Sequence, residues 1–158
     1  MATSIDVARF IVKWFQEHGD LVTNLKVQKL LYYVQGWHLG ITKRRAFDGE
    51  FMAWIHGPVN YPVYQEFREF RWNPISRDMG EIVLDPEIEQ HVRDVLSVYG
   101  DETAWELERR THSESPWIKA RGNLPADAEC RTVIADDDMI EYFGGLISDV
   151  ENKEAASA

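Results

Sequence analysis

The stretch TNLKVQKLLYYVQGWHLGI, residues 23–41, predicts the helix against which the rest of the chain packs. Thr23 is placed to cap it, because a threonine hydroxyl can accept a hydrogen bond from a first-turn amide. Apolar residues recur three and four positions apart over about five turns, and Tyr32 and Tyr33 widen that stripe. A helix that is apolar most of the way round lies in the middle of a domain. Gly36 costs about 1 kcal/mol relative to alanine in a helix interior, which suggests that another backbone approaches there.

The remaining patterns predict a mainly α fold, a compact single domain around this central helix with one minor extended element. Ser4 can cap a first helix that Gly19 ends, and the short loop that follows folds this helix back against the central one. Asp101 and Asp136 are also placed as helix caps. The other expected elements are an extended segment at 50–55, a break at 56–59, a helix opened by Asn60, a possible strand at 81–84, a helix capped by Asp85, a short helix started by Ser115, a loop at 122–132 and a last helix to Val150.

We expect residues 1–150 to form one domain, since no repeat, low-complexity tract or linker interrupts the order of elements. Residues 151–158 lack core-forming side chains and are expected to be a frayed tail. The domain is long enough to bury roughly 70% of the surface that its unfolded chain would expose.

Composition and charge are those of a soluble globular protein. The net charge of −10 repels phosphate backbones, so we expect no direct nucleic-acid partner. The single cysteine, Cys130, excludes an internal disulfide and fits a reducing compartment. We expect a cytoplasmic protein with no membrane partner, because the chain begins with no signal pattern and no apolar run approaches about 18 residues.

No pattern of residues predicts catalysis, a metal or a cofactor. The histidines lack the spacing of a helical zinc site, and the lone cysteine excludes a thiolate finger. A small hydrolase that uses His56, His112 and Glu114 stays open as an alternative. Residues so close in sequence rarely orient as a triad, and residues 111–115 are better explained as the end of one helix and the start of the next.

Polar and aromatic residues gather in three places, at 32–38, 54–58 and 111–117. Most of these side chains are expected in the core, with their polar atoms satisfied by internal hydrogen bonds. If some of them meet at the surface, they form the aromatic-rich kind of patch that is typical of protein recognition. Composition alone leaves both outcomes open.

Three blocks of sequence carry a resemblance to a known family: LKVQKLLYYVQGWHLGI at 25–41, AFDGEFMAWIHGPVNYPVYQEF at 46–67 and ELERRTHSESPWIKAR at 106–121. They closely resemble, in the same order, the signature blocks of the Panacea-domain family. These proteins are the SocA-like antitoxins, which are often found in phage and mobile regions. The resemblance runs from about residue 5 to residue 121, and the chain after residue 121 resembles no pattern of the family.

The resemblance implies a non-enzymatic antitoxin that neutralises a cognate protein toxin by direct contact, without catalytic residues or a cofactor. At least one relative delivers its toxin to an ATP-dependent protease, so a proteolytic adaptor, or a phage-related regulatory protein, remains an alternative. The signature blocks supply a candidate set of partner-binding residues, for which packing is the competing role. This set is Trp54, His56, Gly57, Pro58, His112, Glu114 and Trp117.

Overall fold

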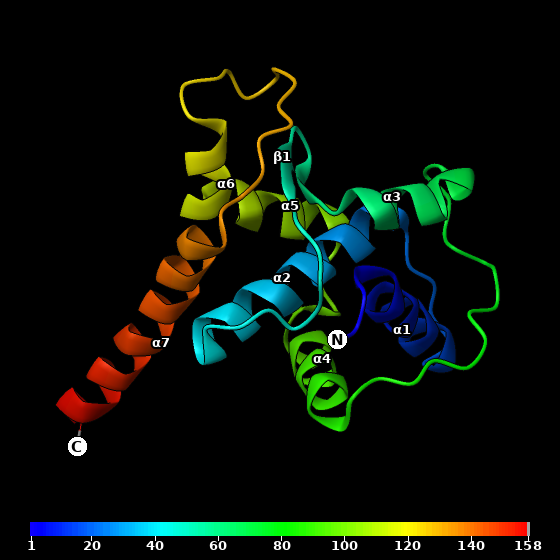
Figure 1. Cartoon of the computed structure of the whole chain (residues 1–158), viewed down its shortest axis with the longest axis horizontal. Coiled ribbons are helices and arrows are strands. Elements are labelled where there is room, and N and C mark those ends of the chain that lie inside the picture. The colour runs from blue at the N-terminus through cyan, green and yellow to red at the C-terminus, as the bar shows by residue number, and fades with distance from the viewer. Residues whose placement is uncertain (158) are drawn as a thin grey trace.

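The computed structural model describes residues 1–157 and confirms the mainly α single-domain fold (Figure 1). Within these residues a small two-stranded sheet accompanies the helices. The elements in chain order are α1 (Ser4–Glu17), α2 (Asn24–Thr42), β1 (Met52–Trp54), β2 (Gly57–Val59), α3 (Tyr61–Phe67), the 3-10 helix η1 (Arg68–Phe70), α4 (Pro86–Tyr99), α5 (Ala104–Ser113), α6 (Ser115–Arg121) and α7 (Asp136–Ser157).

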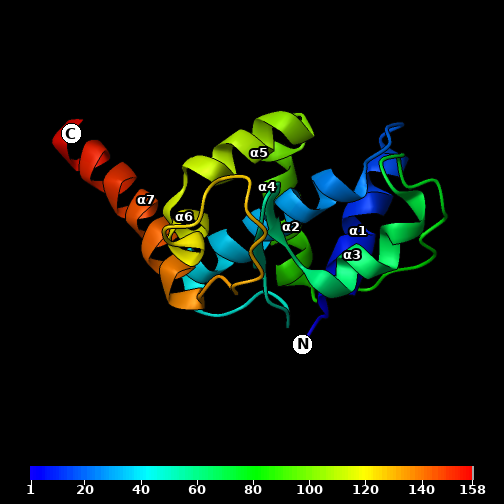
Figure 2. The same ribbon diagram turned by 90° about the horizontal axis from the view of Figure 1, so that it is seen from above.

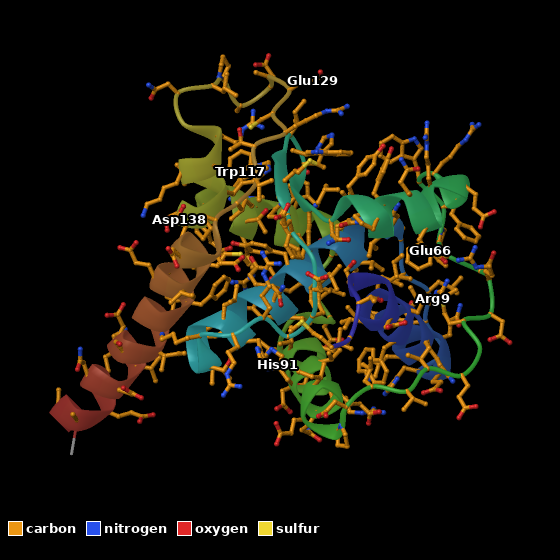
Figure 3. The ribbon with its side chains drawn as sticks, in the orientation of Figure 1. Arg9, Glu66, His91, Trp117, Glu129 and Asp138 are labelled. Carbon is orange, nitrogen blue, oxygen red and sulfur yellow. The ribbon has the colours of Figure 1, made fainter. Side chains whose placement is uncertain are left out.

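Helix α2 lies in the middle of the fold, as its sequence predicts. It packs against α1, α3, α4, α5, α7 and β2, and both views show these elements arranged around it (Figures 1 and 2). The side chains of Tyr32 and Tyr33 are fully buried, although a tyrosine carries a polar hydroxyl. Helix α1 folds back against α2, and the 2.8 Å ion pair between Arg9 and Glu66 ties α1 to α3 (Figure 3).

Helix α7 closes the side of α2 that carries two glycines. A Cβ added to Gly36 would overlap the ring of Phe143. The group that approaches Gly36 is therefore a side chain, and the prediction of a backbone approach at this residue is wrong. The backbone does approach one turn later, where a Cβ on Gly40 would lie 3.0 Å from the Gly144 nitrogen. Small residues at these two positions therefore let α7 dock closely on the central helix.

The structure confirms three of the predicted helix caps, at Thr23, Asn60 and Asp85. Two other caps lie at different residues. Thr3, not Ser4, caps α1, because Asp6 stands three positions after it and completes a capping box. Thr103, not Asp101, caps α5 for the same reason. Ser115 and Asp136 are the first residues of their helices and do not cap them.

The extended segment forms half of a hairpin that the sequence predicts only in part. The sequence predicts a break in the pattern at residues 56–59. Instead Gly57–Val59 form β2, which pairs antiparallel with β1 so that Pro58 lies opposite Ala53. A third chain segment lies on the other edge of β1, where Ala53 N–H donates to the Thr132 carbonyl at 2.9 Å. The possible strand at 81–84 is wrong, because those residues form no regular element.

The chain after Arg121 has two structural parts. Its first part returns to the hairpin, and its second part is α7, which continues past Val150 to Ser157 where the sequence predicts a frayed tail. The C-terminal half of α7 points away from the body of the domain in both views (Figures 1 and 2). Residues 148–156 of this half are exposed.

Substitution of Gly36 tests the packing of α7 on α2. We expect Gly36→Ala to lower the free energy of unfolding by about 1–3 kcal/mol, because the added methyl group overpacks the contact with Phe143. Gly145→Ala is the matched control, since nothing lies within 4 Å of a Cβ at that position. There alanine should stabilise α7 by about 1 kcal/mol. Urea unfolding measures both, and equal effects of the two substitutions would contradict the packing.

Candidate functional site

The β1–β2 hairpin packs on the turn between α5 and α6. The indole N–H of Trp117 donates to the carbonyl oxygen of Trp54 at 2.9 Å, and Trp117 is only 6% exposed. The ring of His112 stacks on Trp117 with 4.1 Å between the ring centroids. Figure 3 shows Trp117 beside the hairpin. Trp117 and His112 therefore fix the position of the hairpin. Burial of the His112 ring lowers its pKa.

Gly57 and Pro58 belong to the same packed layer. Gly57 has a φ of 116°, and a Cβ at this residue would lie 3.0 Å from the Thr111 hydroxyl and 3.2 Å from the Lys29 ammonium nitrogen. Only glycine adopts such a backbone readily. The Lys29 nitrogen is buried without a hydrogen-bond partner among the described residues, and this burial lowers its pKa to about 8. The hairpin therefore covers a buried amine.

Glu114 lies at the junction of α5 and α6, and its carboxyl group faces α2 and α7. Its two carboxylate oxygens each accept from the Tyr33 hydroxyl of α2 at 3.1 Å, and Tyr142 of α7 is a further hydroxyl neighbour. Burial raises the pKa of Glu114 to about 7, and the tyrosine hydrogen bonds and Arg110 oppose that rise in part. This carboxyl group joins α2, α6 and α7.

The structure does not join His56, His112 and Glu114 through a hydrogen bond. His56 is exposed at the tip of the hairpin and contacts Glu108 of α5, with 2.8 Å between Nδ1 and Oε1. Glu114 is instead held by tyrosine hydroxyl groups. A close His–Glu pair in an accessible cleft would favour the hydrolase alternative, and burial of these groups would count against it. Glu114 is buried against Tyr33, and the glutamate that pairs with His56 is Glu108.

A groove of about 290 Å³ opens on the other side of the hairpin. Trp54 and Tyr64 form an aromatic pair in its wall, with 5.1 Å between their ring centroids. Trp72 projects beside them and is 80% exposed, although tryptophan is among the residues that gain most from burial. The lining comes from α2, the hairpin, α3, the chain after η1 and the segment at 129–131: Asn24, Leu25, Gln28, Trp54, Ile55, His56, Val59, Tyr64, Arg71, Trp72, Glu129, Cys130 and Arg131.

The backbone that presents Trp72 is strained. Arg71, the residue before it, has a φ of 54° and a ψ of −118°, a region that side-chain-bearing residues rarely adopt. Such a conformation costs on the order of 1–3 kcal/mol and persists only where the surrounding structure holds it. Strain of this kind clusters at functional sites, and here it directs a large aromatic side chain toward solvent beside the groove.

The predicted partner-binding set divides into two groups. Trp54 and His56 line the groove and are accessible. The remaining five residues are buried or half-buried in the packing around the α5–α6 turn: Gly57, Pro58, His112, Glu114 and Trp117.

The predicted set does not contain the other groove residues. Four of these bring aromatic or cationic side chains to the groove: Tyr64, Arg71, Trp72 and Arg131. A signal for Trp72 exists, because it directly precedes Asn73–Pro74 in a polar stretch where no apolar face continues. A tryptophan in such a turn has no helix face through which to be buried. No comparable sequence signal points to Arg131.

These features define a small helical domain whose most distinctive surface is an aromatic groove. The model of the family described as Antitoxin SocA-like, Panacea domain, matches residues 27–118, more than half of the chain, and the chain belongs to this family. The matched region begins in α2 and ends in α6, so it contains the hairpin and most of the groove. A comparison with curated proteins and one with solved structures each find no match.

Membership in this family gives the chain an antitoxin role at the level of the family, and a toxin as its general kind of partner. Within residues 1–157, none of the helices combines the length and the apolar character needed to cross a membrane.

The ionisation of Glu114 makes stability depend on pH. Its pKa of about 7 in the folded protein exceeds the ordinary value of 4.5, so the stabilisation is complete below about pH 4.5 and is lost as the pH rises through 7. We expect Glu114→Gln, which cannot ionise, to gain stability relative to the unmodified protein by at most about 1.4 kcal/mol per pH unit across this window.

Urea unfolding at pH 5, 6, 7 and 8 measures this difference. The comparison cancels the contribution of His112, whose lowered pKa acts in the opposite direction. Glu151→Gln, on the exposed end of α7, is the control and should follow the unmodified protein at every pH. A stability difference for Glu114→Gln that stays constant from pH 5 to pH 8 would contradict the assignment.

Proposed function

We propose that this protein is an antitoxin that neutralises its cognate toxin by direct protein contact, and that the aromatic groove is the contact surface. The observation that carries the proposal is Trp72, a strongly exposed tryptophan held beside the groove by a strained backbone in a domain of an antitoxin family. Tryptophan, tyrosine and arginine dominate the binding energy of protein interfaces, and the groove presents all three.

The groove also suits sequestration because two of its aromatic residues lie in regular elements of the fold. Trp54 is in β1, whose two edges are both paired, and Tyr64 is in α3, which Asn60 caps. A surface that is already ordered loses little conformational entropy when a partner binds. The proposal requires no catalytic step and no cofactor.

Substitution of Trp72 tests the contact surface. We expect Trp72→Ala to abolish rescue of growth in cells that express the cognate toxin, and to weaken toxin capture in a pull-down by at least tenfold. Truncation of a central interface tryptophan costs on the order of 2 kcal/mol or more, which corresponds to a loss of that size. Stability should change little, because Trp72 is 80% exposed.

Trp105→Ala is the matched control, since Trp105 is 62% exposed on α5 and lies outside the groove. It should retain rescue and capture. The groove is excluded as the contact surface if both variants neutralise the toxin equally well. A neighbouring reading frame whose product does not arrest growth would remove the main support for a paired antitoxin.

A further inference from the structure

We propose that the groove binds an extended acidic segment of the partner protein that carries a large apolar side chain. The apolar side chain enters the space between Trp54, Tyr64 and Trp72, and the neighbouring carboxylates pair with Arg71 and Arg131. This inference rests on the proposed function for the identity of the partner, but the recognition chemistry can be tested without the toxin.

The charge of the groove differs from that of the rest of the chain. The protein carries a net charge of −10, yet two arginines and a single carboxylate, Glu129, line the groove. Figure 3 shows Glu129 on the segment between α6 and α7, above the hairpin. The groove is therefore a locally cationic place on an acidic protein, which favours association with a segment of the opposite charge.

Within the described part of the chain, the two groove arginines have no carboxylate partner, whereas five of the other nine arginines do. Arg9, Arg45, Arg77, Arg93 and Arg110 each form an ion pair with a carboxylate. Among residues 1–157, Arg71 and Arg131 form no ion pair, although acidic side chains outnumber basic ones in this chain. A guanidinium presents several fixed donors that match a carboxylate, so these two residues have free capacity for one.

The size and the wall of the groove set the apolar part of the ligand. A volume of about 290 Å³ is at the small end for binding pockets, so it holds one large side chain rather than a whole folded element. Aromatic rings in the wall gain most from contact with another aromatic or branched apolar side chain. An extended segment can place such a side chain in the groove while its neighbours reach the flanking arginines.

A single-stranded nucleic acid is the competing ligand, because its bases stack on aromatic rings and its phosphates pair with arginine. That mode requires a cationic track along several nucleotides, and the groove offers two arginines on a chain whose overall charge repels phosphate. The observations therefore favour the acidic peptide segment, and an oligonucleotide serves as a probe in the test.

The experiment is titration of the full-length, ¹⁵N-labelled protein, followed through its tryptophan indole N–H signals. The probes are a short peptide with one tryptophan flanked by aspartates, the same peptide with lysines in place of the aspartates, and an oligothymidylate. We expect the aspartate peptide to shift the signals of Trp54 and Trp72 but not that of Trp105, with at least tenfold tighter binding than the lysine peptide.

Charge reversal identifies the cationic partners. Arg71→Glu and Arg131→Glu should each weaken binding of the aspartate peptide at least fivefold. Arg44→Glu, which causes the same change in net charge at the other end of α2, roughly 28 Å away, should not. All three arginines are exposed, so the substitutions should leave the fold intact. Unchanged dispersion of the other amide signals checks this.

Equal binding of the two peptides, tighter binding of the oligothymidylate, or no indole shift with any probe would each overturn the inference. These outcomes are separable from the fate of the proposed function. If Trp72→Ala loses toxin rescue while the peptides show no charge preference, the groove remains the toxin contact and the acidic segment is wrong. If the peptide preference is found but Trp72→Ala still rescues growth, the acidic-segment site stands and its assignment to the toxin fails.

Discussion

The structure depends on the hydrogen bonds that two buried glutamines of α2 make to irregular chain. Gln35 donates to the Phe47 carbonyl at 2.9 Å and accepts from the Ala46 amide at 2.8 Å. Gln28 accepts from the Asn60 amide at 2.8 Å, just before α3. The chain between α2 and α3 contains only the short hairpin, so its buried backbone groups need partners from elsewhere. A backbone group left unsatisfied costs about 1–3 kcal/mol, which makes these side chains the anchors of the hairpin.

Once the hairpin is anchored, its two sides have different roles. One side is fixed by Trp117, by the Lys29 region and by Arg121, whose guanidinium donates to the Ala53 carbonyl at 2.9 Å. The other side remains accessible and forms the wall of the groove with Trp54. Five members of the predicted partner-binding set are thus used in packing, whereas Trp54 and His56 remain at the groove. Packing occupies one face of the small sheet, and the groove opens on the other.

The sequence predicted the helices well because amphipathic periodicity and capping residues are local signals. It placed α2 at the centre, and the buried Tyr32 and Tyr33 agree with that position. It failed where long-range contacts decide: β2 is a strand because Gly57 can adopt a positive φ beside Lys29, and local patterns treat Gly–Pro as a break. The candidate site was predicted only in part. Exposure of Trp72 and proximity of Arg131 depend on how distant segments meet, and no spacing in the sequence encodes that.

The docking of Phe143 against Gly36 and Gly40 makes the folded unit larger than the region that the family model matches. The family match covers residues 27–118, whereas the ring that fills the glycine face of α2 comes from α7. A fragment cut to the matched region would expose that face to water, together with the surface that α1 covers, and would carry edges that invite self-association. The region that the family model matches therefore needs α1 and α7 beside it to bury the surface of α2.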